Sequence, residues 1–167
     1  MAPGTRAYVG LGANIDEPLD HLRRALADLD HPPAARLVRV SRPCRSPPLG
    51  GQDQPAYWNA VAEIETGLEP GRLLSWFHAI EYRHGRRRGP EHWAPRPLDL
   101  DLLLYGTLVR TGPDPVLPHP GLASRAFVLY PLREIAPGLE IPGLGSLEAL
   151  CARSSPHDLV FLDDWPR

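Results

Sequence analysis

The segment Ala94-Pro95-Arg96-Pro97-Leu98-Asp99-Leu100-Asp101-Leu102-Leu103-Leu104-Tyr105 places two aspartates one residue apart in a run of leucines. The leucines and the closing tyrosine predict a buried β-strand, and we expect this strand to be central in its sheet. Alternate side chains of a strand share a face. Asp99 and Asp101 are therefore expected to point the same way, with the leucines at 98, 100 and 102 on the opposite face.

The two acids have two interpretations. Their Cα atoms should lie about 6.5 Å apart, given about 3.3 Å of rise per residue, and two like charges this close on an apolar strand repel each other and lose hydration. One or two bound cations would relieve the repulsion, and carboxylate oxygens suit Mg²⁺. Alternatively, the acids lie at the sheet edge and pair with the nearby Arg86, Arg87, Arg88 and Arg96. The spacing alone leaves both interpretations open.

Length and composition narrow the class of protein. With 167 residues the chain is expected to form one domain over residues 1–167. A formal net charge of −2 argues against a general nucleic-acid binder, and no apolar run is long enough to cross a membrane. The N-terminus leads into a strand rather than a signal peptide. Cys44 and Cys151 form no metal motif, and we interpret them as reduced thiols of a cytoplasmic protein.

Lysine is absent, because all 18 lysine-plus-arginine positions are arginine. This excludes Schiff-base chemistry, a lysine general base and the lysine of a P-loop. Any phosphate binding must use arginine, histidine, backbone N–H groups or a metal. Arginine suits the task because its planar fork grips a phosphate through two hydrogen bonds.

Hydrophobic periodicity predicts the order of the elements. Strands are expected over residues 6–11, 36–45, 57–65 and 99–105, with short strands near 108–110 and 116–117. Helices are expected over residues 18–29, 70–84, 124–135 and 146–152. The glycines at 10–14 predict a tight turn, Gly85 is expected to end the second helix, and Pro131 should kink the third helix or shift its start. This order predicts an α+β fold, a ferredoxin-like antiparallel sheet (split β-α-β) with helices packed on it in three α/β/α layers.

Four segments together resemble one family. They are the opening glycine turn at 10–14, the proline-rich loop and following strand at 45–60, the acid-containing segment at 92–103, and the corner at 118–120 with residues 125–129. In this order and spacing the chain is similar to the 6-hydroxymethyl-7,8-dihydropterin pyrophosphokinase family, from about residue 8 to residue 137. The segment at 92–103 is the most specific part of the resemblance.

The resemblance implies a Mg²⁺-dependent pyrophosphokinase of folate biosynthesis. Such an enzyme moves the β,γ-pyrophosphate of ATP, its co-substrate, onto the hydroxymethyl group of the reduced pterin and releases AMP. Positioning and charge neutralisation supply most of the catalysis in a transfer of this kind. The resemblance also implies two Mg²⁺ ions held by Asp99 and Asp101. We expect a monomer that binds these small molecules, with no nucleic-acid or membrane partner.

Individual roles are carried over from the resemblance. The catalytic residues would be Arg86, Arg88, Arg96, Asp99 and Asp101. The pterin would contact Ser46, Pro47, Leu49, Tyr57, Asn59, Trp93 and Phe127. The nucleotide would contact His78, Glu81, Arg88, Arg96, Leu102, His119, Pro120 and Arg125. The chain departs from the family pattern on the nucleotide side, at His78, Asp114 or Pro115, Val116 and Pro120.

Two other functions fit parts of the pattern. A two-metal phosphoesterase could use Asp99, Asp101 and His119, although such sites usually contain more ligands. A non-catalytic module could present Tyr57 and Phe127 to a base or peptide, and each of these aromatic residues taken singly is typical of a core. Formation of AMP from ATP and the pterin would separate the three functions.

Overall fold

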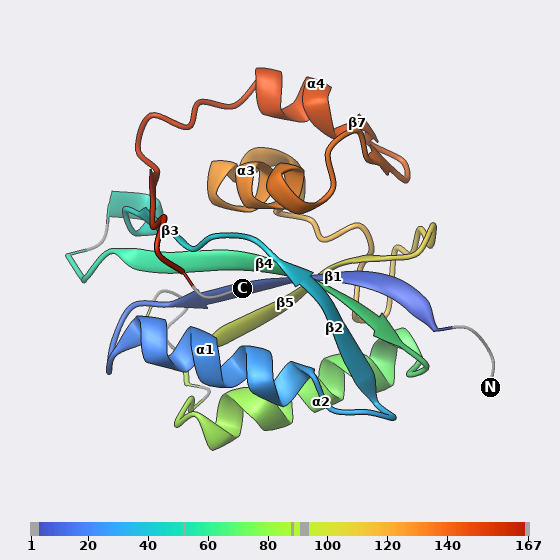
Figure 1. The fold of residues 1–167 in the computed structure, drawn as a ribbon, viewed down its shortest axis with the longest axis horizontal. Coiled ribbons are helices and arrows are strands. Elements are labelled where there is room, and N and C mark those ends of the chain that lie inside the picture. Colours follow the sequence, from blue (N-terminus) through green and yellow to red (C-terminus); the bar gives the residue numbers. More distant parts are fainter. Residues whose placement is uncertain (1–3, 52, 88, 91–93, 166–167) are drawn as a thin grey trace.

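The computed structural model describes residues 4–51, 53–87, 89–90 and 94–165, and it contains an antiparallel sheet with helices on both faces (Figure 1). The strands of the main sheet are β1 (Thr5–Ala13), β2 (Ala35–Val40), β3 (Cys44–Ser46), β4 (Tyr57–Thr66), β5 (Asp99–Tyr105) and β8 (Val160–Phe161). The helices are α1 (Pro18–Leu29), α2 (Pro70–Arg83), α3 (Ala126–Ile135) and α4 (Leu147–Ala152), with short 3-10 turns η1 (Leu49–Gly51) and η2 (Leu122–Ser124). A separate ribbon pairs β6 (Glu140–Ile141) with β7 (Gly145–Ser146).

Strand β1 lies between β4 and β5 and is antiparallel to both. On the side away from β1, strand β4 pairs with β2 and β3, and β3 pairs with β8. Within the described part of the chain β5 therefore has one neighbour, and the expectation of a central acid-bearing strand is wrong. The leucine run was misleading because helices cover both faces of this edge strand. Leu100 and Leu102 belong to one core, whereas Leu103 and Leu104 belong to the other.

The two cores lie on opposite faces of the sheet. Helices α1 and α2 cover one face, α3 covers the other, and α4 packs on α3 further from the sheet (Figure 1). Strand β4 contributes to both cores by alternation, with Ala60, Ala62 and Ile64 towards α1 and α2 and Val61 towards α3. The predicted antiparallel sheet with packed helices is confirmed. No helix in the described residues has the length and apolar character needed to cross a membrane.

The opening turn predicted at 10–14 is wrong, because β1 continues to Ala13. Its glycines serve close packing instead. A β-carbon on Gly12 would lie 3.3 Å from Oδ1 of Asn59, which is tighter than most real contacts, and one on Gly10 would lie 3.5 Å from Leu103 Cδ2. These two glycines face Asp99 and Asp101 across the β1–β5 ladder. Both glycines line the same pocket as the two acids, and without side chains they keep this part of β1 open beside them.

Other boundaries differ from expectation. The strand predicted over 36–45 is divided into β2 and β3, and between them Ser41 bonds to Val61 through both its backbone N–H and its hydroxyl. The two short strands near 110 reduce to a single bridge between Arg110 and Leu117. Helix α3 starts at Ala126 and contains Pro131. Helix α2 ends at Arg83, and Gly85 follows with φ of 94°, the left-handed conformation that glycine adopts readily.

Candidate active site

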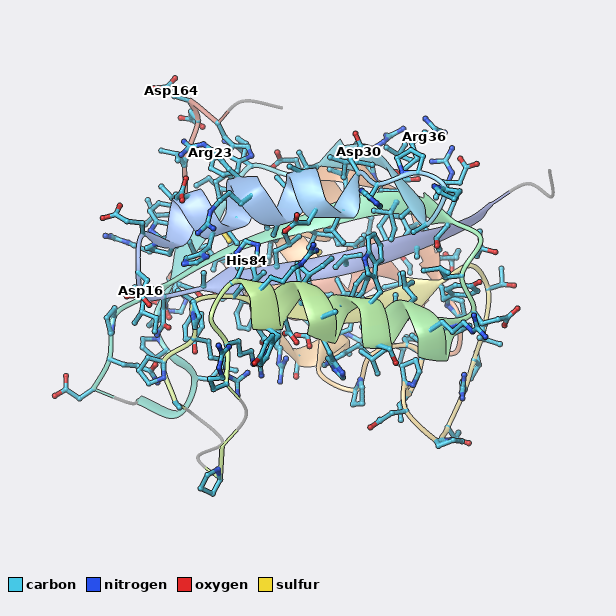
Figure 2. The ribbon with its side chains drawn as sticks, turned by 90° about the horizontal axis from the view of Figure 1, so that it is seen from below. Asp16, Arg23, Asp30, Arg36, His84 and Asp164 are labelled. Carbon is cyan, nitrogen blue, oxygen red and sulfur yellow. The ribbon has the colours of Figure 1, made fainter. Side chains whose placement is uncertain are left out.

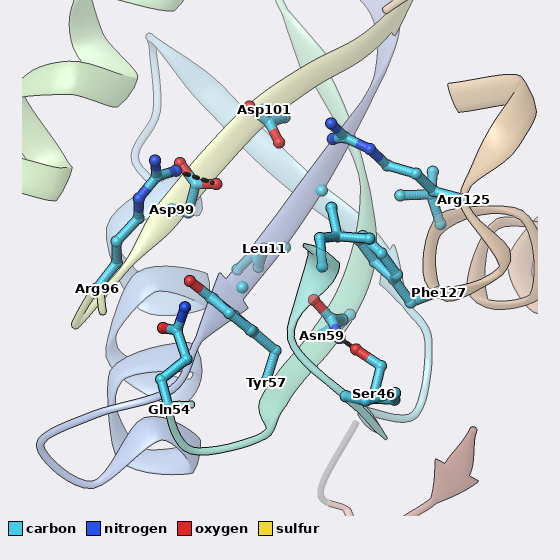
Figure 3. A pocket seen from close by; sticks show the side chains of 16 residues that line it. Leu11, Ser46, Gln54, Tyr57, Asn59, Arg96, Asp99, Asp101, Arg125 and Phe127 are labelled. Carbon is cyan, nitrogen blue, oxygen red and sulfur yellow. Dashed lines mark hydrogen bonds and ion pairs between the residues drawn. The ribbon is translucent and has the colours of Figure 1, made fainter. Parts of the chain in front are cut away.

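One pocket opens between the sheet and the start of α3 (Figure 3). Its lining comes from β1, β3, β4, β5, the loop between β3 and β4, and α3. The residues are Gly10, Leu11, Gly12, Ser46, Pro47, Leu49, Gln54, Tyr57, Asn59, Ala60, Arg96, Asp99, Asp101, Arg125, Phe127 and Val128.

Both acids line this pocket, as the alternation of β5 predicts. Asp99 forms ion pairs with Arg86 and with Arg96, the latter 3.2 Å from Arg96 Nη1 to Asp99 Oδ2 (Figure 3). The arginine pairing expected from the alternative interpretation is therefore present at Asp99. Asp101 lies 3.7 Å from Nε2 of His119.

The charges around Asp101 keep it ionised. Burial acts to raise the pKa of this carboxyl, but the contact with His119 and the charges of Arg125 and Arg86 outweigh it, so the pKa lies below its usual value. An ionised Asp101 carboxylate does not have to release a proton before it can bind a cation. It is suited to binding a cation.

Glu81 of α2 lies beside the acids but does not line the pocket. It is 2% exposed, and its Oε2 accepts hydrogen bonds from Arg86 Nη1 at 2.6 Å and from the backbone N–H of Leu100 at 2.9 Å. Burial acts to lower the pKa of Arg86, but the negative charges of Asp99, Glu81 and Asp101 raise it by more, so the net shift of the pKa is upward. Glu81 therefore holds both the edge of β5 and the guanidinium that reaches Asp99.

The other end of the pocket is aromatic. Tyr57 of β4 and Phe127 of α3 enter it from different elements, and Asn59 lies between them (Figure 3). The Asn59 Nδ2 donates a hydrogen bond to Ser46 Oγ at 2.8 Å, and both side chains are buried. This bond fixes the orientation of the amide. Such a slot suits a flat heterocycle with polar edges.

The side-chain amides of Asn14 and Gln54 connect the loops around the pocket. The sequence predicted a role for neither of them. Gln54 lines it directly. Asn14, at the end of β1 and 2% exposed, donates from Nδ2 to Gln54 Oε1 at 2.8 Å and to Pro55 O at 3.1 Å. Its Oδ1 accepts from the backbone N–H of Arg96 at 2.9 Å. Both amides lie in segments that carry the family resemblance, but neither their type nor their spacing predicted this contact between loops.

Replacing Asn14 by alanine is expected to destabilise the protein by about 1–3 kcal/mol, because the backbone N–H of Arg96 and the carbonyl of Pro55 each lose a buried partner. Asn14→Asp keeps an oxygen for the N–H of Arg96 but replaces the donor by a buried charged oxygen that faces the oxygens of Gln54 and Pro55, so it should be at least as destabilised as Asn14→Ala. Urea denaturation measures the series. An Asn14→Ala variant as stable as wild type would show that the amide does not hold the two loops.

The remaining expected site residues are dispersed. His119 approaches Asp101 and accepts from the N–H of Gly121 through Nδ1, and Arg125 lines the pocket. Leu102 is buried in the core under α1 and α2, so its side chain does not face the pocket. Outside the pocket lining, His78 is half-buried on α2 and Pro120 is exposed. Arg88 and Trp93 lie outside the described residues.

Asp99 and Asp101 fit a metal ion whose remaining ligands come from a bound phosphate and from water. Among the described residues no group of three or more His, Cys, Asp or Glu side chains is arranged to hold an ion. Mg²⁺ is often bound through one or two carboxylates, with phosphate oxygens and water completing the octahedron. Asp99 and Asp101 provide two such carboxylates, and Arg96 and Arg125 line the same pocket as possible phosphate partners.

Comparisons of the chain with known proteins identify its family. Residues 8–137 match the model of the 7,8-dihydro-6-hydroxymethylpterin-pyrophosphokinase (HPPK) family. The chain is 44% identical over 147 residues to the 2-amino-4-hydroxy-6-hydroxymethyldihydropteridine pyrophosphokinase of Pseudomonas aeruginosa, covering 88% of this chain and 90% of that one. It is 40% identical over 157 residues to the protein of the same name from Haemophilus influenzae, covering 94% and 98%.

The fold is also found among solved structures. A crystal structure of an HPPK-DHPS in complex with substrates matches with a TM-score of 0.72 at 9% identity, over 91% of this chain. This chain spans 43% of that longer protein, and the likeness concerns the fold alone. The family match and the relatives confirm the resemblance drawn from the sequence: the chain belongs to the 7,8-dihydro-6-hydroxymethylpterin-pyrophosphokinase family.

Proposed function

We propose that this chain transfers the β,γ-pyrophosphate of ATP onto the hydroxymethyl group of 6-hydroxymethyl-7,8-dihydropterin and releases AMP, a step of folate biosynthesis. The observation that carries the proposal is a single pocket with acids and arginines at one end and an aromatic–amide slot at the other. A transfer between a triphosphate and a flat heterocycle needs these two ends to be adjacent. The relatives that carry the name of this pyrophosphokinase support it.

The proposal treats residues 1–167 as one pyrophosphokinase domain with a ferredoxin-like core. The order β5-β1-β4-β2 supports this, because α1 joins β1 to β2 and α2 joins β4 to β5, as in a split β-α-β unit. We also infer a cytoplasmic monomer. Two buried free cysteines are in keeping with a reducing compartment, and light scattering tests the oligomeric state.

Mg²⁺ belongs to the proposal, with Asp99 and Asp101 as ligands of two ions and ATP as co-substrate. Bound there, the ions would neutralise charge on the triphosphate and acidify the attacking hydroxyl. The chain's own residues prepare this end of the pocket. Arg86 and Arg96 pair with Asp99 before the nucleotide binds. If these guanidinium groups turned to the phosphate oxygens, Asp99 would be released towards a cation.

The other residues bind and orient the substrates. Arg88, His119 and Arg125 contact the phosphates together with Arg86 and Arg96, whereas Glu81 acts by positioning Arg86. Tyr57 and Phe127 stack on the pterin, and Trp93 closes over the site. Asn59 and the rim formed by Ser46, Pro47 and Leu49 bind the polar edge of the ring. His78 is proposed to border the nucleotide, and Leu102 and Pro120 are proposed to border it through their backbone groups.

Ser46→Ala is expected to weaken pterin binding by about 2- to 12-fold, the equivalent of one hydrogen bond of about 0.5–1.5 kcal/mol. Without the serine hydroxyl, Asn59 Nδ2 loses the partner that fixes its amide. Ser46→Thr keeps a hydroxyl and should bind nearly as wild type does. Calorimetric titration measures the pterin, and the affinity for an ATP analogue should not change. Equal pterin affinity in Ser46→Ala and wild type would refute the role of this bond.

Incubation with Mg²⁺, ATP and the reduced hydroxymethylpterin tests the function itself. AMP should form only when the pterin is present. ADP or phosphate formed without the pterin would identify a phosphoesterase instead. Absence of any product, combined with tight binding of a polynucleotide or peptide, would identify a binding module.

A further inference from the structure

Two buried histidines contact each other between α1 and α2. His21 of α1 and His84, the C-cap residue that directly follows α2, are 5% and 7% exposed. Their Nδ1 atoms are 2.8 Å apart, and the ring centroids are separated by 5.1 Å. Figure 2 shows His84 in the seam between the two helices. Neither histidine lines the pocket, and the proposed function gives neither of them a role.

Charged groups contact both ends of this pair. Arg24 Nη2 lies 3.0 Å from the same Nδ1 of His21. At the other end, Asp28 Oδ2 lies 2.9 Å from Nε2 of His84, and Arg83 Nη2 lies 3.8 Å from Oδ1 of Asp28. The contacts therefore run from Arg24 through both rings to Asp28, and they link α1 to the end of α2.

The chemistry of the partners determines where the protons are. An arginine can only donate, so its contact requires a bare Nδ1 on His21. The Nδ1···Nδ1 contact then takes its proton from His84. The carboxylate of Asp28, partly exposed and next to Arg83, is an acceptor and requires a second proton on Nε2 of His84.

We propose that His84 is an imidazolium bound between Asp28 and His21, that His21 is a neutral imidazole with its proton on Nε2, and that acid breaks the His21–His84 contact, one of those that join α1 to the end of α2. A proton added to Nδ1 of His21 removes the acceptor that Arg24 and His84 share. It also brings three cations together. The pair is thus a built-in acid-sensitive contact.

The charges that face His21 support this direction. Burial lowers the pKa of His21, and Arg24 and His84 lower it further, against the smaller opposing effects of Asp16 and Asp20. Below about pH 6.5, the ordinary value for imidazole, the unfolded chain binds a proton here that the folded chain resists. The stabilisation is therefore complete above that pH and is lost as the pH falls through the lower folded-state value.

The link ends close to the candidate active site. The turn that follows His84 is closed by bonds from Gly85 N to Tyr82 O at 3.0 Å and from Arg86 N to Glu81 O at 3.1 Å. Arg86 then reaches Asp99. Loosening the end of α2 would therefore free the backbone that places this guanidinium.

Urea denaturation from about pH 7.5 to about pH 5 tests the proposal. His21→Gln keeps a carbonyl acceptor but cannot be protonated. Wild type should lose stability relative to this variant as the pH falls, by at most about tenfold in the folding equilibrium constant per pH unit. His157→Gln, which replaces an exposed histidine, is the matched control and should follow wild type. An equally steep fall in His21→Gln and wild type would overturn the proposal.

NMR of the imidazole nitrogens of the wild-type protein tests the protonation states of His21 and His84 directly. This test does not depend on whether His21→Gln folds. At pH near 7 both nitrogens of His84 should carry protons, and Nδ1 of His21 should be bare. A neutral His84, or a proton on Nδ1 of His21, would overturn the proposal. In addition, the amide of Arg86 should exchange faster in wild type than in His21→Gln at acid pH. These measurements are made without substrate, so their failure would leave the proposed pyrophosphokinase untouched.

Discussion

Asp101→Ala should lower kcat by about 10³-fold or more, equivalent to about 4 kcal/mol of transition-state stabilisation, while the protein stays folded. The carboxylate is held ionised by His119, Arg125 and Arg86, and it lines the pocket together with Asp99. Without it, one of the two proposed cation ligands is lost. Arg125 lines the open pocket, where water can solvate it, and Arg86 keeps its ion pairs with Glu81 and Asp99, so the fold should survive.

Turnover at saturating Mg²⁺ and ATP measures this effect, and the urea midpoint reports folding. Asp158→Ala is the matched control, because this aspartate is exposed and pairs with an exposed histidine. Near-normal turnover in Asp101→Ala would refute the metal assignment. A large loss of stability would instead show that the acid serves the fold.

Glu81→Ala should destabilise the protein by roughly 3 kcal/mol or more and should also lower kcat. The variant leaves the backbone N–H of Leu100 without its buried acceptor and removes one of the two carboxylates that Arg86 contacts. Glu81→Gln keeps an oxygen for Leu100 but loses the charge, so it should be more stable than Glu81→Ala.

The split between kcat and KM tests whether Glu81 acts through Arg86. If it does, Glu81→Gln should lower kcat more than it changes the KM for ATP. If Glu81 bound the nucleotide directly, as the sequence led us to expect, KM would rise instead. Calorimetric binding of an ATP analogue to both variants separates these outcomes.

The parts of the site that follow from period-2 alternation were predictable. Asp99 and Asp101 share a face because their spacing requires it on any strand. The same rule separates Val61 from Ala60 and Ala62 on β4. The resemblance to the family then selected residues that line the pocket, among them Tyr57, whose aromatic character alone is more typical of a core.

The contacts between elements were not predictable in this way. Glu81 reaches Leu100 only because α2 packs against the edge of β5, and no local pattern reveals that edge when leucines face both cores. Asn14 meets Gln54 and Arg96 because three loops converge at the end of β1. Such side chains act across gaps in the sequence, and periodicity describes a single segment.

A crystal structure with Mg²⁺, a non-hydrolysable ATP analogue and 6-hydroxymethyl-7,8-dihydropterin tests the central claim most directly. The pterin should lie between Tyr57 and Phe127, with its hydroxymethyl group pointing towards the triphosphate. Mg²⁺ should be bound to Asp99 and Asp101. A pterin bound outside this pocket, or a metal bound away from both aspartates, would contradict the account.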